Sequence, residues 1–374
     1  MKILSYAYQD SDEAHWRFSP ITFGEVNLLV GGTSSGKSRL LNTIFNLGRF
    51  AVAKEFKLGN WEVTFEHKSR RYRWTLVSMK KNGAELVQTE KLSELTADRD
   101  VVIIDRGQDR FVFGDRDLPK LSKSETSVSL LADEDAIKPI HEGFSCILRR
   151  LFDRDELSRA GALESIPVRL VDEIRKTKTL DKIRATDPSV STALFLLSEY
   201  FPVQYSAICD HYKSVFPFIA EIVIRDLSEV HKEIAVPGRV PVLCVKERNV
   251  NNWIPFDQLS SGMKKVLLIL TDISLLPDGS IYLIDEYENS LGINAIEFLP
   301  TFLLGLDKAI QFFITSHHPY IINRIPVSSW YIFHRTGSEV RVKFGAELSE
   351  RFGKSKQQAF VQLINDPFYV QGTE

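Results

Sequence analysis

The sequence predicts an α/β fold built around a parallel sheet, and a few segments carry this prediction. Residues 26–30 have the apolar character of a buried strand, residues 31–38 form a glycine-rich loop, and residues 39–45 have helical spacing. Residues 281–284 and 312–315 form two further apolar runs of strand length. A strand, a tight loop and a helix in this order are typical of proteins with a parallel sheet.

The composition is that of an ordinary globular protein. The chain has 374 residues, 44% of them hydrophobic and 26% charged, which is enough for one large core or two lobes. A formal net charge of −2 gives no global attraction for nucleic acid, so any contact with DNA requires a local basic patch.

The cysteine pattern and the apolar runs indicate a cellular compartment. Three cysteines lie far apart without a C-x-x-C pair, which argues against a zinc site or a disulfide framework. No apolar run approaches the roughly 18 residues of a membrane span, and the N-terminus lacks a signal-peptide pattern. We therefore expect a cytoplasmic protein without a membrane partner.

The glycine-rich loop is the most informative segment of the chain. Residues 31–38 fit the pattern G-x-x-x-x-G-K-[ST], in which backbone N–H groups and a helix N-terminus bind phosphate. In this pattern Lys37 reaches the β- and γ-phosphates and the hydroxyl of Ser38 binds Mg²⁺. An ordinary glycine-rich turn is the alternative. The predicted nucleotide-binding residues here are Gly31, Ser34, Ser35, Gly36, Lys37, Ser38 and Arg39.

Two carboxylates follow the strand at residues 281–284. At the carboxyl end of a parallel strand beside the phosphate loop, Asp285 would orient Mg²⁺ and Glu286 would act as the general base for the attacking water. Surface charges at a strand end are the alternative interpretation. A similar run at residues 101–104 ends in Asp105, but Arg106 follows it instead of a glutamate, so we assign it to a lobe strand.

Two further motifs suggest a family. Residues 259–265, Leu-Ser-Ser-Gly-Met-Lys-Lys, precede a helical run and resemble the signature motif of ATP-binding-cassette ATPases, usually written LSGGQ. Residues 316–319, Ser-His-His-Pro, follow the strand at 312–315 and resemble the switch histidine of the same superfamily. With the phosphate loop and residues 284–291, the chain resembles ABC-type ATPase heads of the branch shared by RecF, the structural-maintenance-of-chromosomes proteins and OLD-type ATPases.

The resemblance covers roughly residues 1–145 and 215–345 and implies a site shared between two heads. ATP and Mg²⁺ would lie between the phosphate loop of one copy and the signature motif of the other. A helix that opens near Gly262, with the hydroxyl of Ser260, suits a γ-phosphate, although an ordinary helix cap is the alternative. The residues implied are Ser260, Ser261 and Gly262 in the signature motif, Asn289 between Glu288 and Ser290 in the D-loop, and His317 as the switch, with His318 in support.

The chain departs from the family pattern at the glutamine that senses Mg²⁺. There is no glutamine between Gln108 and Gln204, so Ser127 or Ser129 replaces it, or Gln108 is used from an unexpected loop. Gly292 also stands where relatives often carry histidine.

The pattern of apolar residues divides the chain. A hairpin with its turn near Lys68-Ser69 predicts an antiparallel β lobe. Segments 136–152, 167–178 and 192–200 have helical spacing without sustained heptads, which predicts a compact helical lobe in place of a coiled coil. Strands are expected at 222–226, 233–236, 240–245, 330–333 and 340–342. The expected parts are 1–135 (first half of the ATPase core with the β lobe), 136–215 (helical lobe), 216–346 (second half of the core) and 347–374 (amphipathic tail packed on the core or docked to a partner).

Three functions compete on this basis. The first is an ATPase that forms an ATP-dependent homodimer or larger homo-oligomer and controls a separate effector, a nuclease or toxin, as the resemblance to Septu, PARIS and retron ATPases implies for anti-phage defence. The second is a RecF-like repair ATPase that binds DNA through basic clusters, although a solvated face is the simpler interpretation. The third is an ATP-bound scaffold without turnover. The clusters are Lys68, Arg70, Arg71 and Arg73, and Arg175, Lys176, Lys178, Lys182 and Arg184.

Overall fold

The computed structural model describes residues 1–11, 15–119, 121–230, 233, 238–348 and 356–370. These residues form two compact units. Unit 1 comprises Met1–Arg150, Asp278–Tyr287 and Leu306–Glu374, and unit 2 comprises Leu151–Pro277 and Glu288–Gly305. The first boundary thus lies inside the expected helical lobe of residues 136–215. None of the described helices is long and apolar enough to cross a membrane.

Unit 1 is built on one sheet, which has 14 strands among the described residues. Its strand order is β10-β14-β15-β3-β16-β17-β2-β1-β4-β5-β6-β7-β8-β9. The first five strands of this order run parallel, whereas β1 and β4 to β9 pair antiparallel and form the β lobe. The strands are β1 (Lys2–Gln9), β2 (Arg17–Thr22), β3 (Val26–Gly31), β4 (Gly59–His67), β5 (Arg70–Lys81), β6 (Ala84–Leu95), β7 (Asp100–Arg106), β8 (Phe111–Phe113), β9 (Arg116–Asp117), β10 (Ile147–Arg150), β14 (Ser280–Ile284), β15 (Ile310–Thr315), β16 (Trp330–Thr336) and β17 (Glu339–Phe344).

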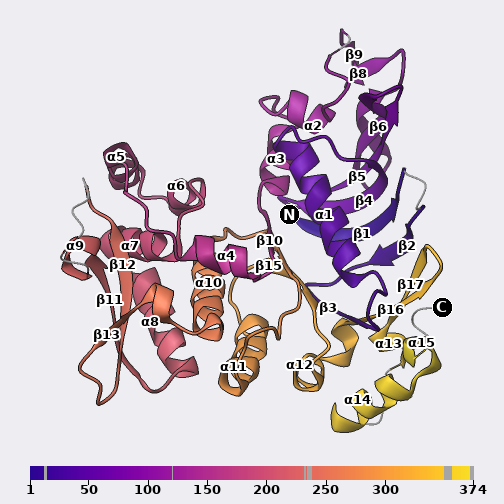
Figure 1. The fold of residues 1–374 in the computed structure, drawn as a ribbon. Coiled ribbons are helices and arrows are strands. Elements are labelled where there is room, and N and C mark those ends of the chain that lie inside the picture. Colours follow the sequence, from indigo (N-terminus) through magenta and orange to yellow (C-terminus); the bar gives the residue numbers. More distant parts are fainter. Residues whose placement is uncertain (12–14, 120, 231–232, 234–237, 349–355, 371–374) are drawn as a thin grey trace. The chain divides into compact units, whose positions relative to one another are not determined.

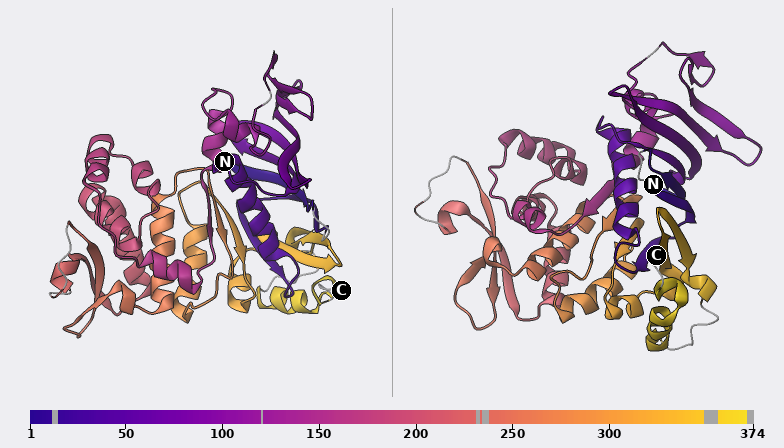
Figure 2. Two further views of the ribbon diagram at one scale, coloured as in Figure 1. Left: turned by 45° about the horizontal axis from the view of Figure 1, so that its top comes forward. Right: turned by 45° about the vertical axis from the view of Figure 1, so that its right-hand side comes forward.

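The helix after the phosphate loop, α1 (Lys37–Val52), packs on β10, β14, β15 and β3. Figure 1 draws it in indigo, and both views of Figure 2 show it along one side of the purple antiparallel strands. The other helices of unit 1 are α2 (Ser127–Leu130), α3 (Lys138–Phe144), α12 (Pro319–Arg324), η2 (Val327–Ser329), α13 (Gly345–Leu348), α14 (Lys356–Asn365) and α15 (Pro367–Val370).

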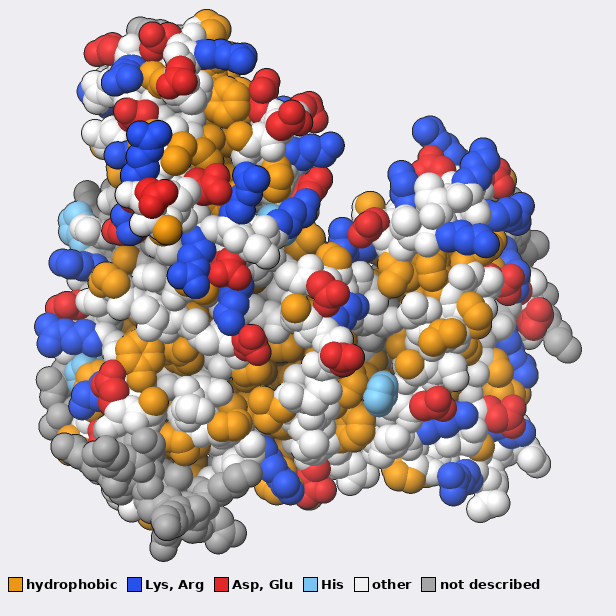
Figure 3. Space-filling view, turned by 180° about the vertical axis from the view of Figure 1, so that it is seen from behind, with side chains coloured by type: hydrophobic (Ala, Val, Ile, Leu, Met, Phe, Trp, Pro, Cys, Tyr) orange, Lys and Arg blue, Asp and Glu red, His pale blue; other side chains and the backbone are white. Residues whose placement is uncertain are grey.

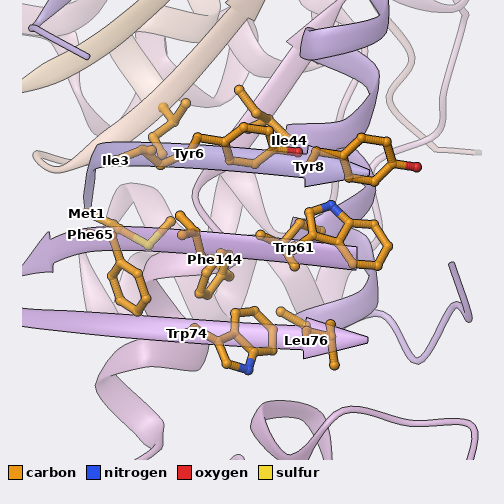
Figure 4. Close-up of a cluster of buried hydrophobic side chains, with 14 of the residues drawn as sticks. Met1, Ile3, Tyr6, Tyr8, Ile44, Trp61, Phe65, Trp74, Leu76 and Phe144 are labelled. Carbon is orange, nitrogen blue, oxygen red and sulfur yellow. The ribbon is translucent and has the colours of Figure 1, made fainter. Parts of the chain in front are cut away.

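Aromatic side chains fill the space between the β lobe and its helices (Figure 4). Tyr6 of β1, Trp61 of β4 and Trp74 of β5 point to the face covered by Ile44 of α1 and Phe144 of α3. Alternate residues of these strands are buried, as expected for strands with one covered face. Because the same core holds α1 and the lobe strands, it fixes the helix that starts at the phosphate loop.

The hairpin prediction is confirmed. β4 and β5 pair antiparallel, and Lys68 and Ser69 between them both have positive φ, as in the tight turns that suit twisted hairpins. The strands expected at 330–333 and 340–342 are also present, as β16 and β17, and they pair antiparallel.

The helical prediction for 136–152 is wrong in its second half. The helix α3 ends at Phe144, and β10 (Ile147–Arg150) then joins the sheet beside β14, in parallel register. The hydrogen bonds that residues 147–150 form with β14 at the edge of the sheet outweigh the helical preference indicated by the apolar spacing.

The C-terminal helices pack on unit 1 itself. α14 contacts α12 and α15 contacts β16, where the ring of Phe368 stacks on His334 with centroids 4.7 Å apart. Residues 356–370 of the tail therefore pack on unit 1, which is the first of the two arrangements expected for the tail. Residues 349–355 and 371–374 lie outside the described part.

Unit 2 combines a three-stranded antiparallel sheet, β11-β12-β13, with helices. Both strands expected at 222–226 and 240–245 are present, whereas the one at 233–236 falls almost wholly outside the described residues. The elements are α4 (Arg154–Ala160), α5 (Val168–Thr177), α6 (Leu180–Arg184), α7 (Val190–Tyr200), α8 (Pro202–Val215), β11 (Ile219–Asp226), α9 (Leu227–Val230), β12 (Pro241–Glu247), β13 (Trp253–Pro255), η1 (Phe256–Gln258), α10 (Ser261–Leu275) and α11 (Ile293–Leu304).

Candidate nucleotide site

The predicted phosphate loop connects β3 to α1 in unit 1. Gly36 caps the helix with φ of 103°, and a Cβ there would lie 3.0 Å from Cγ2 of Val340 and 3.3 Å from the Trp16 ring. Only glycine accepts both the left-handed backbone and this close packing. The second glycine of the motif is therefore required by the fold of the loop.

Lys37 lies inside the loop. Its Nζ donates hydrogen bonds to the carbonyl oxygens of Gly31 (2.9 Å) and Gly32 (2.8 Å), and it lies 3.4 Å from Oγ of Ser35. The side chain is only 6% exposed. The ammonium group is thus held where the loop backbone converges, which is the position a phosphate-binding lysine needs.

Asp285 follows β14 and joins two neighbouring elements. Its Oδ1 accepts hydrogen bonds from Oγ of Ser38, at 2.9 Å, and Oγ1 of Thr315, at 2.7 Å. Ser38 is the second residue of α1 and Thr315 ends β15, so the cluster is assembled from three segments that are far apart in the sequence. Asp285 is 5% exposed, and carboxylate and hydroxyl oxygens are the ligands that Mg²⁺ prefers. The residues fit the metal that the sequence predicts.

Glu286 lies next to this cluster but is exposed. Its backbone has φ of 47°, an uncommon value for a residue with a side chain, and its N–H donates to Oγ1 of Thr315 at 2.7 Å. The hydroxyl of Thr315 thus links the carboxylate of Asp285 to the backbone that orients Glu286. Sequence analysis does not predict Thr315 as a site residue, because the sequence shows it only as the last residue of a strand.

His317 and His318 differ in their surroundings. His317 is exposed and lies two residues after the end of β15. Nδ1 of His318 accepts a hydrogen bond from the N–H of Tyr320 at 3.2 Å and caps α12. His318 is therefore a helix cap in this structure, and both its expected supporting role and the switch role of His317 stay predictions.

Arg39, predicted to contact nucleotide, is engaged with protein groups. Its guanidinium pairs with the carboxylate of Asp10 and lies 4.5 Å from the centre of the Trp16 ring. Contact with a nucleotide would have to share these interactions.

The glutamine that the family uses has no replacement among the serines considered. The hydroxyl of Thr126 donates to the carbonyl of Phe50, near the C-terminal end of α1, which is about 20 Å along the helix from Lys37. The next residue, Ser127, donates to the buried carboxylate of Glu90 at 2.7 Å. These contacts exclude Ser127 and Ser129 as neighbours of the phosphate loop. Gln108 lies between β7 and β8, at the other end of the strand order.

Arg149 is the cation beside Asp285 instead. It lies on β10, and its Nη2 is 3.7 Å from Oδ2 of Asp285, with only 14% of the arginine side chain exposed. Sequence analysis does not predict this pair, because the apolar spacing of residues 136–152 predicts a helix where β10 lies.

The signature-like segment lies in unit 2. Oγ of Ser260 accepts a hydrogen bond from the N–H of Met263 at 3.3 Å, so Ser260 is the N-cap of α10. A Cβ on Gly262 would come within 2.4 Å of the carbonyl oxygen of Ser290, and Nζ of Lys265 donates to the carbonyl of Asn289 at 3.1 Å. The segment thus packs against the predicted D-loop, and the helix cap considered as the alternative is present; phosphate binding by Ser260, Ser261 and Gly262 stays a prediction.

Comparisons with known proteins agree with this geometry. Residues 149–323 match the family model described as "AAA domain, putative AbiEii toxin, Type IV TA system". The structure described as "Crystal structure of the SmcHead bound to the C-winged helix domain of ScpA" aligns with a TM-score of 0.54 at 11% identity, covering 92% of this chain and 98% of that one. An Smc head domain derived from Pyrococcus furiosus aligns with a TM-score of 0.50 at 10% identity, covering 94% and 98%. No curated protein matches the sequence.

The chain has the fold of an Smc-type P-loop ATPase head. This confirms the predicted α/β fold class, and together with the family match it supports an ATP-binding domain. In this Smc-head fold the phosphate loop, Asp285 and Thr315 stand at adjacent ends of parallel strands, where α/β sheets generally bind ligands.

Proposed function

We propose that the chain is an ATPase that binds ATP with Mg²⁺ at the phosphate loop and hydrolyses it slowly. The observation that carries this proposal is the cluster in which Asp285 joins Ser38 and Thr315, with Glu286 beside it. A buried carboxylate with two hydroxyl partners, next to a buried lysine inside a glycine loop, suits a metal and a polyphosphate together.

Each residue has a defined role in this proposal. Lys37 exchanges the carbonyl groups of the loop for phosphate oxygens, and Ser38 and Asp285 hold Mg²⁺, which neutralises phosphate charge when bound. Glu286, positioned through its backbone by Thr315, accepts the proton of the attacking water. The exposed His317 contacts the γ-phosphate side of the site.

We further propose that two copies close around ATP, with Ser260, Ser261, Gly262 and Asn289 of one copy facing the phosphate loop of the other. The supports are the Smc-head fold and the order of the motifs along this chain. A larger homo-oligomer would use the same contact.

Control of a separate effector, a nuclease or toxin, in bacterial anti-phage defence completes the proposal. Its support is the toxin–antitoxin family description matched by residues 149–323, together with an Smc head whose structure holds a second protein, ScpA. Fold likeness does not carry a biological role by itself, so this step depends on the experiment below.

The basic clusters do not favour the RecF-like alternative. At the hairpin, a carboxylate oxygen lies within 4 Å of each of Lys68, Arg70, Arg71 and Arg73 (2.9, 3.7, 3.2 and 3.6 Å). In unit 2, Arg175, Lys182 and Arg184 are likewise paired. Cations that already have partners gain less from a phosphate backbone than free ones, because each contact must be exchanged.

An ATP-bound scaffold without turnover is favoured by one observation. Arg149 pairs with Asp285, the carboxylate proposed to hold Mg²⁺. A resident cation there competes with Mg²⁺ for the carboxylate.

Native mass spectrometry of Glu286→Gln with ATP and Mg²⁺ tests the proposed dimer closed around ATP. We expect two chains with two nucleotides, and monomers with the double variant Lys37→Ala/Glu286→Gln, which keeps the same glutamine but loses the phosphate contact. Monomers of Glu286→Gln at saturating ATP would contradict the dimer.

The same pair of variants, used as bait in a lysate of the host, tests the effector. A second protein retained by Glu286→Gln and absent from the double variant supports the effector role. Retention of DNA without a second protein would favour the repair ATPase instead.

A further inference from the structure

A cavity of about 320 Å³ lies in the β lobe of unit 1, apart from the nucleotide site. It is bounded by the end of the β5–β6 hairpin, the turn between β7 and β8, and Leu118, Leu121 and Lys123. The apolar side chains of Met79, Leu86, Phe111 and Leu121 contribute to its lining. A cavity of this size, lined by both apolar and polar groups, lies at the lower end of the range that holds small-molecule ligands.

The charged groups around the cavity are mainly cations. Lys81, Arg106, Arg110 and Lys123 line it, against one carboxylate, that of Asp109. Lys81 and Lys123 are exposed, and no carboxylate of the described residues lies within 4 Å of either ammonium group. In the hairpin cluster of Lys68 to Arg73, by contrast, all four cations are paired. Figure 3 shows Lys and Arg side chains beside Asp and Glu side chains on one face of the molecule.

The walls of the cavity are fixed before any ligand binds. The guanidinium of Arg106, 6% exposed, donates to the carbonyl oxygens of Ser122 and Glu125, each at 2.7 Å, and lies 5.1 Å from the centre of the Phe111 ring. Its charge is balanced by the buried Glu90, with Nη1 3.5 Å from Oε2. The N–H of Val87 also donates to the carbonyl of Lys123, at 2.7 Å.

These contacts tie three separate segments together around the cavity. A site that needs no ordering on binding loses less conformational entropy, so more of the contact energy appears as affinity. Because Arg106 has its own buried partner, the cations left to attract a ligand are Lys81, Lys123 and Arg110; the last has only a contact of 3.9 Å with Asp105.

We propose that this cavity binds a small organic anion that carries an apolar ring or short chain. The ring would occupy the apolar interior, and the anionic group would lie between Lys81 and Lys123, where a charge-assisted hydrogen bond to each is available. This function is separate from ATP binding, since the cavity shares no residue with the phosphate loop or the Asp285 cluster.

The test is a fluorescence titration of the full chain with anilinonaphthalene sulfonate, an aromatic anion, beside phenylnaphthylamine, its uncharged analogue. We expect saturable binding of the anion at one site, weakened about 10-fold by Lys81→Glu and by Lys123→Glu. Lys80→Glu is the matched control, because it makes the same charge change on β5 but points to the opposite face from Lys81. It should leave the affinity within about 2-fold, as should Lys37→Ala at the phosphate loop.

Three outcomes would overturn the proposal. The first is a dye titration that does not saturate. The second is an equal loss of dye affinity in Lys80→Glu and Lys81→Glu, which would reveal general surface attraction. The third is displacement of the dye by a peptide of glutamates but not by naphthalene sulfonate, which would assign the surface to acidic polypeptide. Equal binding of phenylnaphthylamine to all variants, with unchanged circular dichroism, shows that the glutamates leave the cavity folded.

Discussion

The aspartates near the carboxyl ends of β14 and β7 differ in their surroundings, and of these two only the one after β14 belongs to the candidate site. β14 leads to Asp285 and β7 contains Asp105 near its end, and both strands are apolar runs of similar length. Asp285 is buried and accepts hydrogen bonds from Ser38 and Thr315, whereas Asp105 is half-buried, with Arg110 at 3.9 Å.

The difference comes from the neighbours of each strand. β14 lies between β10 and β15, all three parallel, so the residues after these strands meet at one edge of the sheet. β7 lies between β6 and β8 in antiparallel pairs, so the ends of its neighbours lie at opposite edges. The carboxylate thus acquires its role from topology: a parallel arrangement brings hydroxyl, carboxylate and phosphate loop together, and an antiparallel one does not.

The largest loss of ATP affinity should come from Lys37→Ala, which removes the ammonium group of the phosphate loop near Asp285. Two lost charge-assisted contacts of roughly 1.5–3 kcal/mol each imply ATP binding weaker by about 100-fold or more. Isothermal titration calorimetry measures this, with Lys54→Ala, at an exposed lysine two residues beyond the end of α1, as the control. Unchanged ATP affinity in Lys37→Ala would refute the phosphate-loop assignment.

The direct comparison is Asp285→Asn against Asp105→Asn. Asp285→Asn removes the negative charge beside Ser38, so the apparent affinity for Mg²⁺ in the presence of ATP should fall by about 10- to 100-fold. Asp105→Asn should leave it unchanged. Equal losses in both variants would show that strand topology does not distinguish the two aspartates.

Arg149→Gln tests whether the arginine beside Asp285 competes with Mg²⁺. Removing a competing positive charge 3.7 Å from Oδ2 should strengthen the apparent Mg²⁺ affinity by about 10-fold in nucleotide-binding titrations. Arg149→Lys keeps the charge and should stay near the parent. Weaker Mg²⁺ binding in Arg149→Gln would mean that the arginine supports the metal site instead of competing with it.

The smallest effect should come from Thr315, whose hydroxyl supports Asp285 and the backbone of Glu286. Thr315→Val keeps the shape but loses two hydrogen bonds, and we expect a loss of about 1 kcal/mol per bond in thermal or denaturant unfolding. Thr315→Ser retains the hydroxyl and should recover most of it. A stability of Thr315→Val equal to that of the parent would show that the bridge contributes little.

The sequence predicted the segments of the site better than their assembly. The strand, loop and helix around Lys37 follow from local patterns, as do β14, β15 and the hairpin turn at Lys68-Ser69. Arg149 was missed because β10 becomes a strand only through pairing with β14, a contact across about 130 residues of sequence that no local pattern reports. The prediction that Ser127 or Ser129 replaces the glutamine was wrong because these serines lie near the C-terminal end of α1, away from the phosphate loop. The sequence does not show which end of α1 they contact.

The most direct test of the central claim is phosphate release by the purified chain with ATP and Mg²⁺, compared with Glu286→Gln and Lys37→Ala. The account predicts slow turnover by the parent and none by Lys37→Ala. For Glu286→Gln it predicts a rate at least about 100-fold lower with ATP affinity retained, because a positioned general base contributes roughly 10²–10⁴-fold. Phosphate release by Glu286→Gln at the parental rate would contradict it.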